Sequence, residues 1–344
     1  MVSEHKSAQV NFDSLLKIFT VPEGPDSTLT KIDEELSRNL NHFLRKHIVA
    51  EEKPLKEIEK DFSNAHIPEQ PQFVSDHTQH LLDTLVSHSV HTASPSFIGH
   101  MTSALPYFLM PLSKIMIALN QNLVKIETSK AFTPLERQVL GMIHRLIYGE
   151  ADHFYQQWMH SAEHSLGAFC SGGTIANITA LWVARNNALK AEGDFPGVEK
   201  AGLFKAMRHY GHEGLAILVS ERGHYSLKKA ADVLGIGQEG LVAVKTDAHN
   251  RICPHDLEQK ITELKANKIK VFAVVGVAGT TETGNIDPLR TIAQICQREQ
   301  IHFHIDAAWG GATLMSNRYR GLLDGVELAD SVTIDAHKQL YIPM

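Results

Sequence analysis

The stretch that decides the fold is His302-Phe303-His304-Ile305-Asp306-Ala307-Ala308-Trp309-Gly310-Gly311, and it is followed later in the chain by His337-Lys338. An aspartate thus ends one apolar strand, and a lysine follows the next one. The carboxyl ends of parallel strands meet at one edge of a sheet, where ligands bind in the crevice. The sequence therefore predicts that Asp306 and Lys338 flank a single flat cofactor.

Pyridoxal phosphate is a cofactor that needs such a pair. A lysine amine holds its aldehyde as a Schiff base, and a carboxylate beside the pyridine nitrogen keeps that nitrogen protonated, so that the ring accepts electrons. A simpler interpretation places Lys338 on the surface and makes Asp306 a helix cap. We favour the cofactor site because Lys338 stands between the apolar runs 331–334 and 340–342, and burial favours a neutral, nucleophilic amine.

The composition is typical of a soluble globular protein. The 344 residues are 43% hydrophobic and 21% charged, with a formal net charge of −6. A negative chain has no basic footprint, so we expect neither nucleic acid nor a membrane as a partner. The three cysteines are far apart, as in reduced cytoplasmic proteins, and the first residues lack the apolar run of a signal peptide. We therefore expect a cytoplasmic protein.

The most hydrophobic window covers residues 105–124, but Pro106, Pro111 and Lys114 interrupt it. With these interruptions it does not qualify as a membrane-spanning helix. We expect a buried interface helix instead.

The first part of the chain has a helical pattern. Apolar residues recur every three or four positions over 28–48, which predicts an amphipathic helix. Residues 50–76 are charged and contain three prolines, so they form an extended linker with one helical turn over 55–62. A further helix contains Leu81, Leu82, Leu85 and Val86. We expect residues 1–92 to be a helical and linker segment that wraps around a dimer, and residues 93–344 to be a large cofactor-binding domain.

Thr133-Pro134-Leu135-Glu136 has the pattern of a helix start, with a capping threonine, proline at the first helical position and glutamate three residues after the cap. The expected buried face of this helix consists of Leu135, Val139, Met142, Ile143, Leu146 and Ile147.

Beyond residue 165, short apolar strands alternate with helices. The expected strands cover 168–170, 215–219, 242–244, 271–275, 301–305 and 331–334. This alternation indicates an α/β fold with a mostly parallel sheet and helices on both faces. Pro254 and Pro288 are placed to open two of the helices, and residues 193–213 are expected to form a polar surface insertion.

Ser171-Gly172-Gly173-Thr174 follows the first expected strand and opens a helix over 175–189. Backbone N–H groups, a hydroxyl and the positive end of the helix then converge, which is an anion site. A plain glycine turn is the alternative. With a Schiff-base lysine downstream, phosphate becomes the favoured anion.

Two other patterns carry less weight. Gly235-Ile236-Gly237-Gln238-Glu239-Gly240 has the glycine spacing of a dinucleotide motif, but a helix precedes it and a strand follows, so we expect a turn. The histidine pairs at 77 and 80, 88 and 91, and 209 and 212 share helix faces without the partners of a zinc pattern. We expect solvated histidines and no metal site.

Two further residues follow expected strands. His224 comes after the strand over 215–219 and stands at the same sheet edge as Asp306 and Lys338, where its imidazole can stack on a planar ring. Thr280, after Gly279, follows the strand over 271–275 at this edge. A surface or core histidine is the alternative for His224.

Together these residues resemble the group II pyridoxal-phosphate-dependent amino-acid decarboxylases, the glutamate and aromatic type, over about residues 90–344. The motifs that carry the resemblance are Ser220-Glu221-Arg222-Gly223-His224-Tyr225-Ser226-Leu227-Lys228-Lys229, Ala278-Gly279-Thr280-Thr281, His304-Ile305-Asp306-Ala307-Ala308-Trp309-Gly310-Gly311 and His337-Lys338. The resemblance implies the type I fold of pyridoxal-phosphate-dependent transferases, a homodimer with sites at the subunit interface, and α-decarboxylation of an amino acid.

The resemblance also implies a role for each matching position. Lys338 binds the cofactor aldehyde, Asp306 pairs with the pyridine nitrogen, and His224 stacks on the ring. Ala308 covers the opposite face of the ring. The remaining cofactor contacts are Gly173 and Thr174 at the phosphate, Thr280 at Asp306 or the ring hydroxyl, and His337 near phosphate and substrate.

The substrate side follows from the same resemblance. His100, Thr102 and Asn122 line a polar pocket that suits an acidic amino acid, with L-aspartate, which yields β-alanine and CO2, favoured over L-glutamate and cysteine sulfinate. Two positions depart from the family pattern: His100 stands where animal glutamate decarboxylases have glutamine, and Asp335-Ala336 stands where relatives usually have Asn-Pro.

Two alternatives stay open at this point. An aminotransferase uses the same cofactor fold, because cofactor contacts alone do not choose which bond breaks. An inactive fragment is the other, because the family's large domain has a seventh strand and a small carboxyl-terminal domain with an arginine for the substrate carboxylate. We expect both to be missing after Met344.

Overall fold

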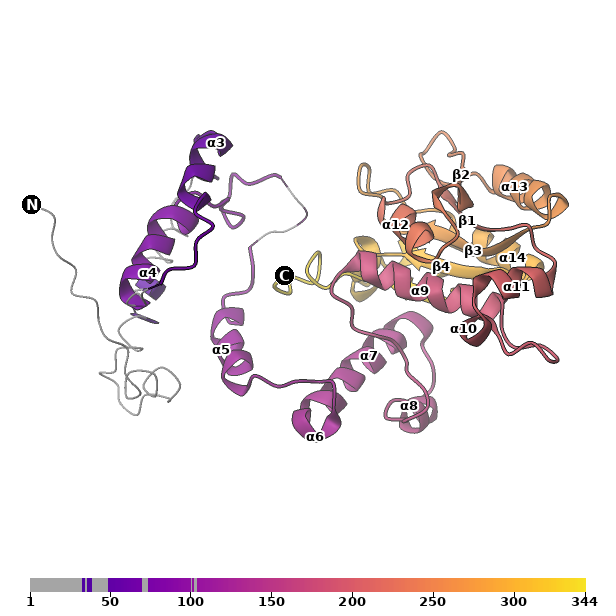
Figure 1. Ribbon diagram of the computed structural model, residues 1–344, viewed down its shortest axis with the longest axis horizontal. Coiled ribbons are helices and arrows are strands. Elements are labelled where there is room, and N and C mark those ends of the chain that lie inside the picture. The colour runs from indigo at the N-terminus through magenta and orange to yellow at the C-terminus, as the bar shows by residue number, and fades with distance from the viewer. Residues whose placement is uncertain (1–32, 35, 39–48, 70–73, 100, 102–103) are drawn as a thin grey trace, which may run out of the picture. The chain divides into compact units, whose positions relative to one another are not determined.

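The structure, a computed structural model, describes residues 33–34, 36–38, 49–69, 74–99, 101 and 104–344 (Figure 1). The chain divides into two units, Met1–Leu105 and Pro106–Met344. Most of the helix expected over residues 28–48 lies outside the described residues, and those described within it are helical. None of the helices among the described residues has the length and apolarity needed to cross a bilayer.

The first unit contains short helical segments. They are α3 (Leu55–Ile58), the 3-10 helix η1 (Glu59–Phe62), α4 (Val74–Leu81) and the π-helical turn η2 (Leu82–Val86). These bounds confirm the expected turn over 55–62 and the helix around Leu81.

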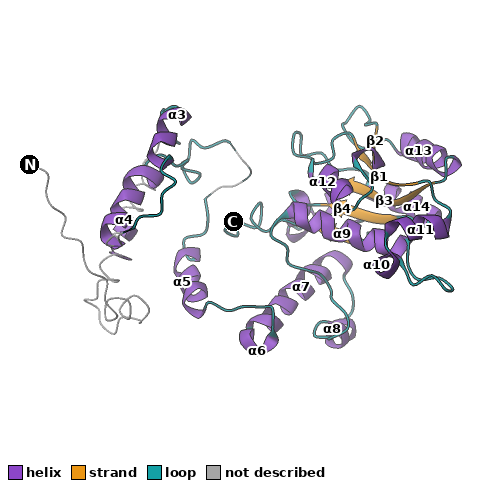
Figure 2. Cartoon of the chain, viewed as in Figure 1, coloured by secondary structure: helices purple, strands orange, loops and turns teal. Residues whose placement is uncertain are grey.

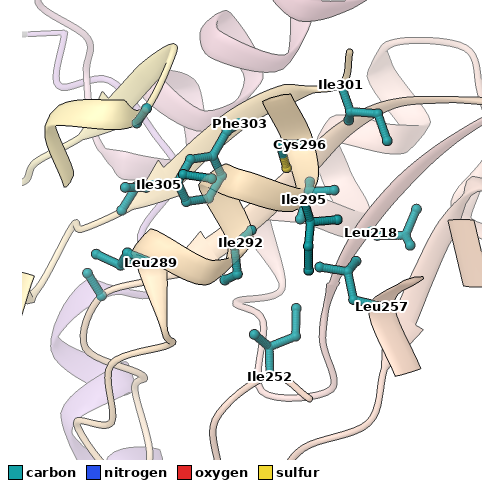
Figure 3. Packing of buried hydrophobic residues seen from close by; sticks show 14 of the residues in the cluster. Leu218, Ile252, Leu257, Leu289, Ile292, Ile295, Cys296, Ile301, Phe303 and Ile305 are labelled. Carbon is teal, nitrogen blue, oxygen red and sulfur yellow. The ribbon is translucent and has the colours of Figure 1, made fainter. Parts of the chain in front are cut away.

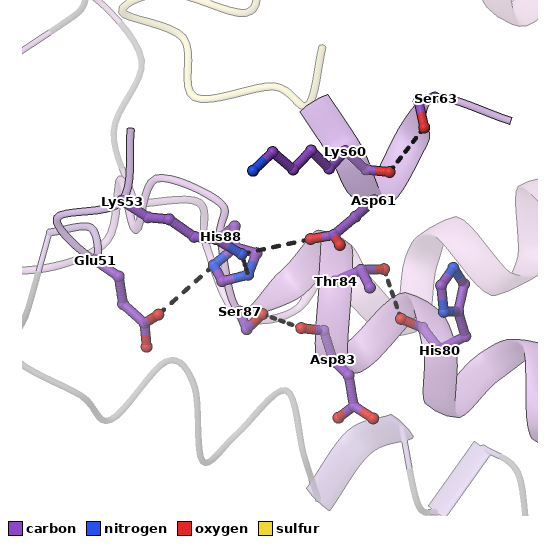
Figure 4. Close-up of polar contacts among 10 residues, drawn as sticks. All are labelled: Glu51, Lys53, Lys60, Asp61, Ser63, His80, Asp83, Thr84, Ser87 and His88. Carbon is purple, nitrogen blue, oxygen red and sulfur yellow. Dashed lines mark hydrogen bonds and ion pairs between the residues drawn. The ribbon is translucent and has the colours of Figure 1, made fainter. Parts of the chain in front are cut away.

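A polar cluster ties the linker of this unit to the end of η2 (Figure 4). Lys53 Nζ lies 3.1 Å from His88 Nε2 and 3.4 Å from Asp61 Oδ2. The other ring nitrogen of His88, Nδ1, lies 3.6 Å from Glu51 Oε2. The linker is therefore held by side-chain contacts, although its prolines and charges predict no further regular structure.

The second unit is an α/β sandwich around one sheet (Figure 2). Its strands are β1 (Gly214–Ser220), β2 (Leu241–Val244), β3 (Ile269–Val277), β4 (His302–Asp306) and β5 (Ser331–Thr333). Its longer helices are α5 (Leu109–Leu119), α7 (Phe132–Tyr148), α8 (Asp152–Trp158), α9 (Gly173–Ala188), α11 (Leu203–Tyr210), α12 (Ser226–Val233), α13 (Pro254–Ala266) and α14 (Leu289–Glu299). The short segments are α6 (Ile126–Ser129), α10 (Val198–Ala201), η3 (Gln238–Gly240), η4 (Gly310–Met315), η5 (Arg320–Leu323) and η6 (Val326–Leu328).

The sheet is parallel throughout, with the strand order β2-β1-β3-β4-β5. Its register aligns the ends of the central strands, since Val277 pairs with Asp306, and Asp306 with Thr333. Residues that follow β3, β4 and β5 therefore emerge at one edge, as the sequence predicts. The parallel sheet with helices confirms the expected fold class.

Helices cover both faces of the sheet, and each face has its own apolar core. One core joins β1, β3 and β4 to α7, α13 and α14. The other joins β1 and β3 to α9, α10, α11 and α12. In the first core, Phe303 of β4 packs beside Ile292 and Cys296 of α14 (Figure 3). Phe303 is 1% exposed, so its truncation to alanine costs about 3–5 kcal/mol.

Several expectations about the second unit are wrong. Residues 168–170 form no strand, since they have no regular secondary structure and Phe169 is 57% exposed. Helix α7 begins at Phe132 with Ala131 as its cap, and Thr133 contacts the Ser129 hydroxyl instead of capping. Of its expected buried face, Leu135 and Met142 are exposed.

The segment 193–213 was expected to be a polar insertion, but it contains α10 and α11. Phe195, Val198 and Ala206 are buried in the second core, so their apolar side chains attach this segment to the sheet.

By contrast, α5 in the apolar window 105–124 buries none of its residues within this chain, so the expected burial of this helix is absent here. The helix starts at Pro254 and after Pro288 and the turn at Gly235–Gly240 are confirmed.

Candidate active site

The candidate site lies at the carboxyl edge of the sheet. The end of β4 supplies Asp306, and the turn after β1 supplies His224. The segment after β5 supplies His337 and Lys338, and the start of α9 supplies Gly173 and Thr174. The topology therefore brings together four parts of the chain that are far apart in the sequence.

Asp306 is a buried carboxylate with two donors. Asp306 is only 6% exposed. Asn177 Nδ2 donates to Asp306 Oδ2 at 2.9 Å, and the backbone N–H of Ala308 donates to Oδ1 at 3.2 Å. Burying a carboxylate is costly unless donors replace the lost water. These two bonds supply that replacement and fix the direction of the carboxylate.

Asn177 is the residue that sequence reasoning missed. It is 1% exposed on α9, and its Nδ2 also donates to Ser226 Oγ at 3.1 Å. Its Oδ1 accepts from His304 Nε2 at 3.1 Å. The buried residues of α9 are Asn177, Leu181 and Ala184, so a polar residue in an otherwise apolar buried stripe was the available signal.

The hydrogen bonds of this buried network have a consistent donor-to-acceptor order from Ser331 through His304 and Asn177 to Asp306. His304 Nε2 donates to Asn177, so its Nδ1 accepts from the Ser331 hydroxyl at 2.9 Å. Burial, together with the neighbouring His302, lowers the pKa of His304 to about 3. His304 is therefore neutral, which matches one donating and one accepting ring nitrogen. No second charge stands behind Asp306 in this network.

His224 is held at the other end of the network. Ser226 donates to His224 Nδ1 from its hydroxyl at 2.9 Å and from its backbone N–H at 3.2 Å. Burial lowers the pKa of His224, and among nearby charges Asp306 raises it while Lys338 lowers it. Ser226 thus orients the imidazole, and the charges of Asp306 and Lys338 are close enough to affect its pKa.

Lys338 is largely buried, as expected, with 15% of its side chain exposed. Its Nζ lies 3.0 Å from Asp335 Oδ2, and His337 Nε2 lies 3.8 Å from the same oxygen. Asp335 is 8% exposed. The amine, the imidazole and this carboxylate form one ion-pair cluster at the end of β5.

The start of α9 is a cradle lined by glycine. Gly172 caps the helix with no side-chain bond, and the first N–H groups of a helix have no intrahelical acceptor. A Cβ atom on Gly173 would lie 2.8 Å from Asp335 Oδ2. Glycine is therefore required for the carboxylate of Asp335 to approach this helix start.

Thr280 is buried in a turn of its own. Its Oγ1 lies 2.8 Å from Thr283 Oγ1 and accepts the N–H of Asn285 at 3.1 Å. The preceding Gly279 has a φ of +99°, and a Cβ there would lie 2.9 Å from the Trp309 ring. Thr280 therefore shapes the loop after β3, and its bonds in the structure are to this loop and not to Asp306.

Of the three expected substrate residues, one lies among the described residues. His100 and Thr102 lie outside the described residues. Asn122 is exposed between α5 and α6, where its Oδ1 accepts the N–H of Val124 at 2.9 Å. Its side chain closes a local turn.

The donor set fits pyridoxal phosphate. A largely buried lysine, an oriented carboxylate, an imidazole held by Ser226 and a glycine cradle at a helix start supply the four kinds of contact that the cofactor needs. A parallel sheet with this set at its carboxyl edge defines a pyridoxal-phosphate-binding protein of the type I transferase fold. Residues 54–344 match the pyridoxal-dependent decarboxylase conserved domain, and the chain belongs to this family.

Individual relatives are consistent with this assignment. The chain is 76% identical over 344 residues to the aspartate 1-decarboxylase of Aliivibrio fischeri, which covers 100% of this chain and 63% of that protein. It is 35% identical over 261 residues to the acidic amino acid decarboxylase GADL1 of Xenopus tropicalis, covering 76% and 46%. The crystal structure of mouse CSAD in apo form superposes with a TM-score of 0.77 at 30% identity, covering 91% and 60%. The chain thus spans less than two thirds of each relative.

Proposed function

We propose that this chain is part of a carboxy-lyase that removes the α-carboxylate of an acidic L-amino acid, with L-aspartate as substrate and β-alanine and CO2 as products. The observation that carries this proposal is the 76% identity, over all 344 residues, to a protein named aspartate 1-decarboxylase. The geometry supports it, because the lysine, acid, imidazole and glycine cradle lie at one sheet edge. L-Glutamate and cysteine sulfinate are the alternative substrates.

When bound, pyridoxal phosphate supplies an electron sink for the pair left behind as CO2 departs. Lys338 holds the cofactor aldehyde, and Asp306, oriented by Asn177 and the Ala308 N–H, holds a proton on the pyridine nitrogen. His224, fixed by Ser226, covers one face of the ring, and Ala308 covers the other. The negative charge of Asp306 would favour the protonated form of that nitrogen.

The other cofactor contacts follow from the cradle. Gly173 and Thr174 offer the N–H groups at the start of α9 to the phosphate. His337 is proposed to act near the phosphate and the substrate, and Thr280 to steady the cofactor from the loop after β3. His100, Thr102 and Asn122 are proposed to line the pocket for the acidic side chain.

We further propose that the protein works as a cytoplasmic homodimer. The support is the apolar surface of residues 105–126, where α5 and its flanks expose large side chains over a continuous stretch of sequence. Ile117 is 76% exposed and Val124 84%. Apolar surface of this extent is a mark of an interface. The cysteines at 170, 253 and 296 are free thiols, which fits a reducing compartment.

The test is product analysis with the purified full-length protein and added pyridoxal phosphate. We expect L-aspartate to yield equal amounts of CO2 and β-alanine, at a higher kcat/KM than L-glutamate or cysteine sulfinate. A 2-keto acid is added in a parallel reaction. A new amino acid derived from the keto acid, without release of CO2, would show an aminotransferase and contradict the proposal.

A further inference from the structure

Asp335 touches both groups that the proposed cofactor needs for its attachment. Its Oδ2 lies 3.0 Å from Lys338 Nζ, the proposed Schiff-base amine. Both of its oxygens also stand against Gly173, because a Cβ built there would lie 2.8 Å from Oδ2 and 3.0 Å from Oδ1. One carboxylate therefore contacts the lysine and the start of α9 at the same time.

The position of Asp335 is fixed by the backbone. Its N–H donates to the Ala308 carbonyl at 3.2 Å, which ties the segment after β5 to the segment after β4. The residue is 8% exposed. The backbone of Asp335 is thus fixed by the fold, and the polar partners of its carboxylate are Lys338 and His337.

The Asp335 carboxylate lies beside Gly173, the first residue of α9. Helix N-termini attract negative groups through free N–H groups and the helix dipole. A cofactor phosphate at the same helix start carries the same sign of charge. In a site with little water, two such groups repel each other more strongly than on the surface.

We infer that Asp335 is an internal competitor of the cofactor: its carboxylate occupies the phosphate-binding end of α9 and pairs with Lys338, and it thereby weakens the binding of pyridoxal phosphate. This inference rests on the proposed function for the identity of the cofactor. For the cofactor to bind, the Asp335 carboxylate would have to leave its contacts with Lys338 and Gly173.

The first experiment measures dissociation constants by absorbance titration of the full-length protein, with Asp335→Asn as the variant. Asparagine keeps the shape of the side chain and removes its charge. We expect Asp335→Asn to bind pyridoxal phosphate at least about tenfold more tightly than the unmodified protein, because the loss of one short-range like-charge contact is worth this factor or more. Asp232→Asn, which neutralises an exposed acid on α12, is the matched control and should leave the constant unchanged.

Pyridoxal, which lacks the phosphate, separates the two contacts of Asp335. If Asp335→Asn acts only by releasing Lys338, the affinity for both ligands should increase equally. If Asp335 competes with the phosphate, the affinity for pyridoxal phosphate should increase more than that for pyridoxal. An equal gain for both ligands, or no gain for either, overturns the inference. A larger gain for pyridoxal phosphate supports it.

Inorganic phosphate provides a readout without the cofactor. We expect phosphate to raise the melting temperature of Asp335→Asn more than that of the unmodified protein, and Asp335→Ser to behave in the same way if the asparagine variant folds poorly. Equal stabilisation of all three proteins by phosphate overturns the inference. If phosphate discriminates as expected but no protein binds pyridoxal phosphate, the proposed function fails while the assignment of Asp335 at the anion site stands.

Discussion

Asn177 of α9 donates from Nδ2 to Oδ2 of Asp306 at the end of β4, at 2.9 Å, with both residues buried. The same helix begins at Gly173, in the cradle proposed for the phosphate. One helix therefore connects the proposed phosphate end of the site to the acid proposed to face the cofactor ring. The distance between these two ends depends on α9 and not on a flexible loop.

Removal of the Asn177 amide should destabilise the protein. Asn177→Ala leaves Asp306 with one donor fewer and leaves His304 Nε2–H without its acceptor. Unsatisfied buried polar groups cost about 1–3 kcal/mol each. We expect a decrease of about 2–4 kcal/mol in the free energy of unfolding measured in urea. Asn187→Ala, on the exposed side of the same helix, should change it by less than about 0.5 kcal/mol, and equal effects of the two would contradict this account.

The imidazole of His224 should contribute to cofactor binding through its flat face. His224→Ala removes the ring, whereas His224→Phe keeps a planar ring without the bond to Ser226. We expect the dissociation constant for pyridoxal phosphate to rise about tenfold in the alanine variant and by less in the phenylalanine variant. An absorbance titration measures both. If the phenylalanine variant loses as much affinity as the alanine variant, stacking is not the role of this residue.

Asp287 should make stability depend on pH. It is buried where it accepts the N–H groups of Ile252 at 2.7 Å and Val277 at 2.8 Å, and burial raises its pKa from 3.8 to about 6. The folded protein then binds a proton between pH 4 and 6 that the unfolded chain releases. The contribution of Asp287 to the free energy of unfolding is therefore present below pH 4 and lost as pH rises through 6.

Urea unfolding of the unmodified protein and of Asp287→Asn at pH 4, 5, 6 and 7 measures this dependence. The asparagine does not titrate, so the stability of the unmodified protein relative to the variant should fall as pH rises from 4 to 6 and then level off. A constant difference across this range would mean that Asp287 does not titrate there.

The apolar surface around α5 should be covered in a dimer. Ile117, on α5, is 76% exposed within the single chain, and an aspartate there would place a charge in the proposed interface. We expect light scattering to show a dimer for the unmodified full-length protein and a shift toward monomer for Ile117→Asp. Phe204→Asp, at a residue 75% exposed on α11, serves as the control and should stay dimeric. A monomeric unmodified protein would rule out the homodimer.

The parts of the fold that could be predicted were those with local signals. Apolar runs bounded by turns marked the five strands found among the described residues, because strands buried on both faces are rich in apolar residues. The segment 168–170 has the same short apolar pattern, yet Phe169 is exposed and the segment is unpaired. Three residues are too few to distinguish a buried strand from an extended connection.

The capping prediction for α7 failed because the same local motif fits two different helix starts. Thr133, Pro134 and Glu136 are compatible with a helix start, but they are equally compatible with the first turn of a helix that begins at Phe132. Proline is tolerated throughout the first turn, because the N–H groups there have no intrahelical acceptor.

The site could be predicted as a set of positions but not as a network. Asp306 and Lys338 are recognisable because each follows a strand, and parallel register brings them to one edge. The partners of these residues depend on tertiary packing. Asn177 reaches Asp306 from a helix 129 positions earlier, and the contact between Asp335 and Lys338 depends on the turn after β5. No spacing rule in the sequence predicts either distance.

The central claim is that Lys338 holds pyridoxal phosphate, and covalent mapping tests it most directly. The full-length protein is mixed with pyridoxal phosphate, reduced with borohydride and digested for mass spectrometry. The account predicts a pyridoxyl phosphate group on the peptide that contains Lys338, with visible absorbance before reduction that is lost in Lys338→Ala. Stoichiometric labelling of another lysine, or unchanged absorbance in Lys338→Ala, would contradict it.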